Sequence, residues 1–303
     1  MAVYVVGDFL RETRLRKGYT QEEVSYGICT PASLSRIENG AQKPGRLILE
    51  KLFERLGTEN NLFNSFVSRE EMELYSAIQS LIRDITDEDV TKLEEHISIV
   101  EKLATNASEL EHQCLYFAKG ELARQKEKDD SKAMELYLKA IHVTLPNFDG
   151  INCLKNNLLT FDEIMIINAI AILHANNGDI MQAIRLDMWL KEYMENKIVD
   201  GTMKTAKYPM IIYNLSDWFG DEKCHSEALR MADEGIDFCI KYGNLVFLPI
   251  LVLNKGIALA EIGKMNEAKK YLHQAITILE AMKKPKRVKI AIDWCKEHYD
   301  IEF

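Results

Sequence analysis

The chain has 303 residues, of which 47% are hydrophobic, and a formal net charge of −9 at pH 7. This length predicts one small and one large domain, and no apolar run approaches the length of a membrane span. The chain starts without the pattern of a signal peptide and its six scattered cysteines form no Cys-x-x-Cys pair, so we expect a cytoplasmic protein with reduced thiols and without a zinc or redox motif.

The charge is distributed unevenly along the chain. Residues 1–66 carry nine Lys or Arg and eight Asp or Glu, a net charge of +1, which leaves −10 for residues 67–303. A near-neutral N-terminal part with its basic residues on one side can approach DNA, whereas phosphates repel an acidic remainder. The asymmetry permits DNA binding without establishing it.

The first two predicted helices have recognisable ends. Apolar side chains recur at helical spacing over residues 6–17, and Gly18 ends that helix as a C-terminal cap. Thr20 is placed to cap the second helix, and Glu23 three residues later completes a capping box.

A third helix is predicted after a turn that contains Gly27. Thr30 caps it and Pro31 takes its first position, where the missing N–H costs nothing. Two short helices joined by a tight turn form a helix-turn-helix, which places its second helix in the DNA major groove. A helical wheel turns one side of this helix toward the core, namely Pro31, Leu34, Ile37 and Glu38.

The opposite side of the third helix is expected to meet DNA. Arg36 suits a guanine or a phosphate, and serines suit either bases or phosphates. Gln21, at the start of the second helix, is placed for a phosphate contact, and the loop after the third helix adds another. The predicted DNA-binding residues are Gln21, Ala32, Ser33, Ser35, Arg36, Asn39 and Lys43.

A family resemblance rests on the spacing of these residues. The pattern Arg14-x-x-x-Gly18-x-Thr20-Gln21-Glu22-x-Val24, followed by Leu34-Ser35-x-Ile37-Glu38-Asn39-Gly40, resembles the Cro/C1-type (XRE) helix-turn-helix family over about residues 6–57. The resemblance implies a structural ion pair between Arg14 and Glu38. The segment from Gln21 to Glu38 is one residue shorter than in phage repressors, which resembles regulators of Gram-positive bacteria that respond to peptide pheromones. The alternative is a small helical bundle that does not bind DNA.

The rest of the chain is predicted to form helical repeats. Residues 46–56 give a fourth helix, residues 57–61 a hinge or cap, and residues 69–85 and 88–104 two connecting helices. Residues 254–275 then match the tetratricopeptide signature, with small residues where two helices approach and large ones between pairs. Copies align on alanines spaced more widely than a standard repeat, and residues 284–303 are expected to cap the array. The anchors are Ala133, Ala183, Ala228 and Ala268.

The predicted fold is therefore all-α. Residues 1–66 are expected to form the helix-turn-helix domain. Residues 67–303 are expected to form a right-handed α-solenoid of tetratricopeptide-like repeats, which serves as a sensor and dimerisation domain.

The first helix of each repeat pair is expected to line a concave face. Asparagine amides can bond both N–H and C=O of an extended peptide, and Met, Ile and Tyr offer adaptable apolar pockets. Asn214 and Asn254 share one repeat position, at which tetratricopeptide domains commonly grip peptide backbone. The alternative for each asparagine is a hydrogen bond between helices or a solvated position. The predicted peptide-binding residues are Asn168, Ile172, Asn176, Met210, Tyr213, Asn214, Asp217, Leu253, Asn254 and Ile257, with Met165 and Ile250 beside them.

The two halves together resemble the Rgg/PlcR/PrgX type of peptide-responsive regulator. This resemblance implies a homodimer that binds a palindromic operator in double-stranded DNA and a short peptide pheromone that changes its DNA affinity. A DNA-anchored adaptor that binds a partner protein is an alternative, and a peptide-regulated phosphatase-type protein is another, although such proteins lack a helix-turn-helix. The seven histidines are isolated, and no catalytic motif appears. We therefore expect no enzyme activity, cofactor, metal or membrane partner.

Overall fold

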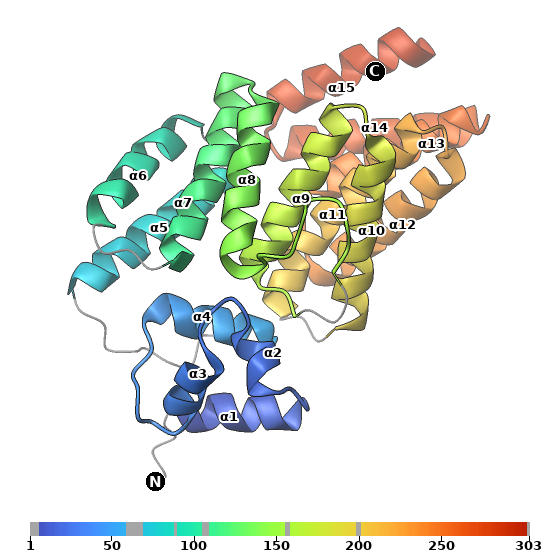
Figure 1. The fold of residues 1–303 in the computed structure, drawn as a ribbon. Coiled ribbons are helices and arrows are strands. Elements are labelled where there is room, and N and C mark those ends of the chain that lie inside the picture. Colours follow the sequence, from blue (N-terminus) through green and yellow to red (C-terminus); the bar gives the residue numbers. More distant parts are fainter. Residues whose placement is uncertain are drawn as a thin grey trace. The chain divides into compact units, whose positions relative to one another are not determined.

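The computed structural model describes residues 6–58, 69–87, 90–104, 109–154, 158–197 and 201–301. Over these residues the backbone forms fifteen α-helices and one π-helical turn, and no strand (Figure 1). This confirms the predicted all-α class. The chain divides into two units, one reaching Leu173 and the other formed by His174–Lys197 and the residues from Gly201 onward. The predicted domain boundary at residue 66 lies outside the described residues and stays a prediction.

The first unit begins with four short helices around one apolar core. Leu10, Val24, Leu34 and Phe53 are fully buried there, and the ring centroids of Phe9 and Phe53 lie 5.8 Å apart. We refer to these helices as the reading domain: α1 Val6–Arg16, α2 Gln21–Ser25, α3 Pro31–Glu38 and α4 Arg46–Arg55.

The helix ends of the reading domain form as the sequence predicts. The Thr20 hydroxyl accepts the N–H of Glu23, and the Glu23 carboxylate accepts the N–H of Thr20 at 2.7 Å. The Thr30 hydroxyl accepts the N–H of Ser33 at 3.1 Å. Gly18 ends α1 with a φ of +74°, a conformation that favours glycine.

The remaining helices of the first unit pack as pairs. In the pair α7 and α8, a Cβ on Gly120 would lie 2.5 Å from the ring of Tyr137, so glycine permits this close approach. The anchor alanine Ala133 is fully buried. The helices are α5 Arg69–Asp87, α6 Val90–Leu103, α7 Glu109–Leu122, the π-helical turn η2 Ala123–Glu127, α8 Asp130–Thr144, and α9 Phe161–Asn176, whose residues up to Leu173 belong to this unit.

The second unit continues the helical pairs. The anchor alanines Ala183, Ala228 and Ala268 are buried. A Cβ on Gly256 would lie 2.6 Å from the side chain of Leu272, so here too a glycine lets two paired helices approach. The helices are α10 Ile180–Asn196, α11 Gly201–Asp221, α12 His225–Tyr242, α13 Leu248–Glu261, α14 Met265–Ala281 and α15 Pro285–Tyr299. None of the helices over the described residues has both the length and the apolarity needed to cross a lipid bilayer.

Candidate DNA-reading surface and ligand face

Helix α3 has two distinct sides. Leu34, Ile37 and Glu38 are buried, whereas Ala32, Arg36 and Asn39 are exposed, and Ser33 and Ser35 lie at the border. The helical wheel predicted that Pro31 faces the core, but Pro31 is exposed. It is the first residue of α3, and its ring lies at the N-terminal end of the helix rather than over the core. The outward side is the one that sequence analysis assigned to DNA.

The Arg36 guanidinium is held across the outward side of α3. Its Nε donates to Gln42 Oε1 at 2.9 Å, and its Nη2 donates to Ser33 Oγ at 3.2 Å. Gln42 was not among the predicted residues, and only the fold of the loop brings its side chain back to Arg36. Nearby, Arg11 Nη1 donates to Asn39 Oδ1 at 3.4 Å, and Lys43 is exposed. These contacts hold the Arg36 guanidinium in one orientation on the outward side of α3.

A buried ion pair fixes α1 to α3. Arg14 donates from Nε to Glu38 Oε1 at 2.6 Å and from Nη2 to Glu38 Oε2 at 2.9 Å, and its Nη1 donates to the carbonyl of Tyr19 at 2.9 Å. Arg14 is 7% and Glu38 2% exposed. The hydrogen bond to Glu38 raises the pKa of Arg14, so the guanidinium remains charged.

Gln21 belongs to the same cluster. Its Nε2 donates to Glu38 Oε2 at 2.7 Å, so Glu38 is bonded by two side chains. Because a phosphate accepts hydrogen bonds and the Gln21 carbonyl oxygen cannot donate, only the second N–H of this amide is left for the predicted phosphate contact. This structural role depends on where Glu38 lies in the fold, so no local sequence signal predicts it.

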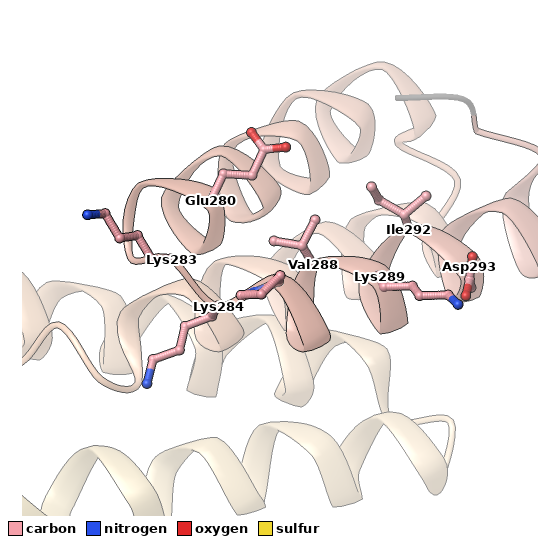
Figure 2. Close-up of a pocket in the computed structure, with 8 residues that line it drawn as sticks. Glu280, Lys283, Lys284, Val288, Lys289, Ile292 and Asp293 are labelled. Atoms are coloured by element: carbon pink, nitrogen blue, oxygen red, sulfur yellow. The ribbon is translucent and has the colours of Figure 1, made fainter.

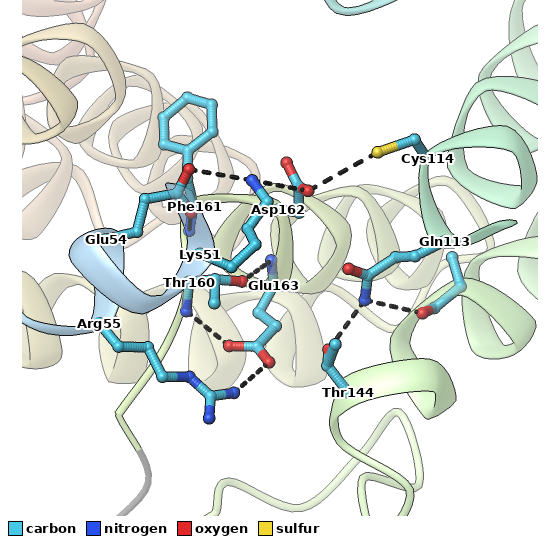
Figure 3. A network of polar contacts seen from close by, with 11 residues as sticks. Lys51, Glu54, Arg55, Gln113, Cys114, Thr144, Thr160, Phe161, Asp162 and Glu163 are labelled. Carbon is cyan, nitrogen blue, oxygen red and sulfur yellow. Dashed lines mark hydrogen bonds and ion pairs between the residues drawn. The ribbon is translucent and has the colours of Figure 1, made fainter. Parts of the chain in front are cut away.

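A second polar cluster, which we call the joint, connects α4 with the start of α9 (Figure 3). Arg55 Nη2 pairs with Glu163 Oε1 at 2.7 Å, and both side chains are completely buried. Lys51 Nζ lies 3.0 Å from Asp162 Oδ2 and 2.9 Å from Glu54 Oε1. The backbone N–H of Phe161 donates to Glu54 Oε2 at 2.9 Å, so a side chain of the reading domain caps α9.

Further contacts surround the joint. Gln113 Nε2 on α7 donates to Thr144 Oγ1 at 2.8 Å and to the carbonyl of Ala140 at 2.9 Å. The turn of the helix-turn-helix approaches the same end of α8, where a Cβ on Gly27 would lie 2.0 Å from the carbonyl oxygen of Thr144. Glycine is therefore favoured at position 27 for two reasons: the backbone lies close to α8, and its φ is positive, at +68°.

The charges of the joint affect one another strongly. Burial raises the pKa of Glu54 to about 7, opposed by Lys51 and assisted by the negative charges of Asp162 and Glu50. Burial alone would lower the pKa of Lys51, but Asp162 and Glu54 outweigh it and raise that pKa. The joint was not predicted, because 108 positions separate Arg55 from Glu163 in the sequence. The one available signal was that Lys51 and Arg55 are four residues apart on α4, on the same side as buried apolar residues of that helix.

The predicted ligand residues on α9 are partly or fully buried. Asn168 is buried, and Met165 and Ile172 are half-buried. In the second unit, Asn176 is exposed, Met210, Tyr213 and Ile250 are half-buried, and the ring centroids of Tyr213 and Phe247 lie 6.3 Å apart. Leu253 and Ile257 differ from the prediction in part, because they pack with Cys295 and Trp294 of α15. Only their remaining exposed surface is available to a ligand.

The matching asparagines Asn214 and Asn254 have different surroundings. Asn214 Nδ2 donates to Asp187 Oδ2 of α10 at 3.2 Å, an inter-helix hydrogen bond of the kind left open as the alternative. Asn254 is 9% exposed, and its Nδ2 has no hydrogen-bond partner among the described residues. Asp187 stands four positions after its anchor alanine, and the residue four positions after Ala228 is Ala232. The repeat of Asn254 therefore lacks the carboxylate that satisfies Asn214.

Asp217 lies one turn after Asn214 and Tyr213 on α11. Its side chain is exposed. Partial desolvation of its carboxylate, together with the like charge of Asp221, raises the pKa of Asp217 to about 6.

An open pocket of about 590 Å³ is lined by the end of α14 and the start of α15 (Figure 2). Val288 and Ile292 form its apolar part, and its rim carries lysines together with the carboxylates of Glu280 and Asp293. None of the residues predicted to contact DNA or peptide lines this pocket.

Comparison with known proteins supports the assignment of the first residues. A helix-turn-helix domain family matches residues 5–66. The uncharacterized HTH-type transcriptional regulator YqaF of Bacillus subtilis (strain 168) is 38% identical over 63 residues, which are 20% of this chain and 83% of that protein.

Solved structures match over nearly the whole chain. PlcR of Bacillus thuringiensis in complex with the peptide PapR7 and DNA has a TM-score of 0.62 at 17% identity, covering 95% of this chain and 99% of that one. A putative transcriptional regulator from Listeria monocytogenes EGD-e has a TM-score of 0.54 at 13% identity, covering 99% and 100%. These matches confirm the predicted combination of a helix-turn-helix with helical repeats. The chain therefore belongs to the HTH-type transcriptional regulators, a family of DNA-binding proteins rather than enzymes, and it has the fold of PlcR.

Proposed function

We propose that this protein is a sequence-specific transcriptional regulator whose repeats bind a short peptide, and that the peptide changes its affinity for DNA. The DNA contacts are the outward residues of α3 and the following loop, with Arg36 as the base-reading side chain. By analogy with the two-fold geometry of helix-turn-helix proteins, two copies would present their α3 helices about 34 Å apart to a palindromic operator.

The unsatisfied amide of Asn254 is the observation that carries the peptide half of the proposal. A buried N–H without an acceptor costs about 1–3 kcal/mol, so a native fold seldom retains one without a use. A peptide backbone carbonyl is the acceptor that such an amide lacks. Asp217 and Tyr213 on the neighbouring α11 add a carboxylate and an aromatic ring for the side chains of the ligand. PlcR, which shares this fold, was solved with the peptide PapR7.

The test begins with a ligand selected on the protein itself. A random heptapeptide library is panned on the immobilised full-length chain, and the selected sequence is synthesised. Genomic DNA fragments are selected in the same way to obtain a duplex. We expect Asn254→Ala to raise the Kd of the heptapeptide about tenfold, since 1.4 kcal/mol corresponds to a factor of ten.

Asn266→Ala, at an exposed position on α14, removes the same side chain and should leave the peptide Kd unchanged. If the library yields no binder, or if the bound heptapeptide leaves the DNA Kd unchanged, the peptide half of the proposal is wrong and DNA reading alone remains.

A further inference from the structure

The loop after α3 folds back onto the end of that helix. Gly40 reverses the chain with a φ of +70°, and its N–H donates to the carbonyl of Ile37 at 3.1 Å. The N–H of Ala41 donates to the carbonyl of Arg36 at 2.8 Å. These two bonds form a Schellman motif, in which a glycine in the left-handed conformation ends the helix. The helix end therefore determines the position of the next residue, Gln42.

Gln42 contacts Arg36 at two points. Its backbone N–H donates to the carbonyl of Arg36 at 3.2 Å, and its Oε1 accepts from Arg36 Nε at 2.9 Å. Gln42 is half-buried, whereas Arg36 is exposed. The amide is thus tied to the backbone of the same residue whose side chain it orients.

Ser33 provides a second contact to the same guanidinium. Its Oγ accepts from Arg36 Nη2 at 3.2 Å and from the hydroxyl of Thr30 at 3.0 Å. Thr30 is the N-terminal cap of α3. The Arg36 guanidinium is therefore held by residues from both ends of its own helix.

The contact with Gln42 determines which edge of the Arg36 guanidinium is available. A guanidinium presents its N–H groups in a rigid planar fork, and it can bind a pair of acceptors through Nε and one Nη or through both Nη groups. Gln42 occupies Nε, so the pairing through Nη1 and Nη2 is the one that stays open.

Guanine is the base that matches this edge. Its O6 and N7 are adjacent acceptors in the major groove, whereas adenine presents N7 beside the N6 donor. A phosphate accepts hydrogen bonds but carries no sequence information. Holding one edge of Arg36 outward therefore serves the recognition of a base rather than of the DNA backbone.

We infer that Gln42 is a specificity-determining residue, which presents the Nη1–Nη2 edge of Arg36 to O6 and N7 of one guanine in each half of the operator. This inference rests on the proposed function, in which Arg36 reads a base, and it adds the identity of that base and the residue that selects it. Gln42 is a positioning residue in this arrangement, because it acts through Arg36.

Two variants separate the acceptor of Gln42 from its size. Gln42→Met keeps the length of the side chain and removes the oxygen that accepts from Arg36, whereas Gln42→Glu keeps both the length and an acceptor. Lys43→Ala, at the next position, is the control, because loss of a phosphate contact weakens all duplexes alike. Thermal melts of the full chain check that each variant is folded, and Gln42→Ala replaces Gln42→Met should the latter not fold.

The DNA probe is the duplex selected from genomic fragments by the wild type. Each guanine is replaced in turn, in both halves of the site, by 7-deazaguanine, which lacks the N7 acceptor. Inosine at the same position is the control, because it keeps O6 and N7 and lacks only the amino group in the minor groove. We expect one position at which 7-deazaguanine raises the wild-type Kd about tenfold and inosine changes it less than about twofold.

The variants should differ in this 7-deazaguanine penalty. Gln42→Met should reduce it to within about twofold, whereas Gln42→Glu should keep it at about tenfold. Lys43→Ala should keep the penalty while its Kd rises for every duplex. In the Arg36→Ala background, Gln42→Met should change the base preference no further, because the two side chains act as one unit.

The outcomes separate this inference from the proposed function. If Gln42→Met keeps the wild-type penalty, Arg36 reads guanine without Gln42 and the inference is wrong. If the wild type binds its selected duplex but no guanine gives a penalty, Arg36 contacts phosphate instead, so the inference is overturned while sequence-specific binding remains. If the wild type selects no duplex, the DNA half of the proposed function fails and the inference fails with it.

Discussion

The two buried charge clusters of the first unit differ in how completely they are satisfied. The Arg14–Glu38 cluster is local and closed: the Glu38 carboxylate accepts from Arg14 and Gln21, and Arg14 also bonds the carbonyl of Tyr19. The joint connects residues that are 108 positions apart in the sequence. Some of its buried polar atoms have no hydrogen-bond partner among the described residues. A cluster in which every buried polar atom has a partner stabilises one arrangement of its helices, whereas unsatisfied buried atoms reduce that stabilisation. The two clusters thus use the same chemistry with different completeness.

The largest expected effect comes from breaking the closed cluster. Glu38→Ala leaves the buried Arg14 charge without its carboxylate, which should lower the free energy of unfolding by about 3–5 kcal/mol. Thermal melts of the full chain measure this, with Glu22→Ala at an exposed position of α2 as the control. A melting temperature equal to that of the wild type would show that the pair is not buried as described.

Gly27→Ala tests the docking of the turn on α8. Both Gly27 and Gly18 have positive φ, but a Cβ on Gly18 meets nothing within 4 Å, whereas one on Gly27 would overlap the Thr144 carbonyl. Gly18→Ala should therefore cost about 1 kcal/mol for its backbone conformation alone. Gly27→Ala should cost about 2–3 kcal/mol, because overpacking is added to the same conformational cost. Equal unfolding free energies for the two variants would contradict the contact with α8.

Arg36→Ala is expected to separate DNA binding from stability. Loss of the guanidinium should weaken binding to the selected duplex by about 1–3 kcal/mol, the range of one bidentate base contact. Its melting temperature should match that of the wild type, since Arg36 is exposed. Lys43→Ala is the comparison, because a phosphate contact should weaken all duplexes alike and leave sequence preference intact. Undiminished duplex binding by Arg36→Ala would remove this residue from the reading surface.

The smallest effect is a pH dependence of the joint. Because burial raises the pKa of Glu54 to about 7, the folded protein holds a proton on this carboxyl that the unfolded chain releases at its ordinary pKa. The resulting stability is full at low pH and is lost as pH rises through about 7. Between pH 8 and pH 6 the wild type should gain about 1 kcal/mol relative to Glu54→Gln. The other charged groups that face Glu54 are Glu50, Lys51 and Asp162, and they are common to both proteins. Denaturant unfolding at the two pH values measures the difference, and parallel behaviour of the two proteins would contradict the raised pKa.

Local features of the fold could be predicted from the sequence, whereas features set by tertiary neighbours could not. The Thr20 and Thr30 caps and the turn at Gly18 follow from residues within a few positions of one another. The Arg14–Glu38 pair followed from a family motif rather than from any local rule.

Other roles required knowledge of what packs against each helix. Gln21 lies beside Glu38, Leu253 faces α15, and Asn214 has Asp187 opposite it while Asn254 has no such partner. A pattern of helical periodicity gives the side of a helix but not its neighbour, so the joint could not be anticipated from residues 51–55 or 160–163 taken separately.

The distance along the chain between the two halves of the joint has a consequence for synthesis. The reading domain leaves the ribosome complete while the acids that will pair with Lys51 and Arg55 are still untranslated, because domains fold in order as they emerge. An apolar docking face would then be exposed to other nascent chains throughout that interval. A charged face stays hydrated until α9 has been synthesised, and it loses that water only when α9 packs against it. The charged joint thus exposes less apolar surface to other nascent chains during that interval.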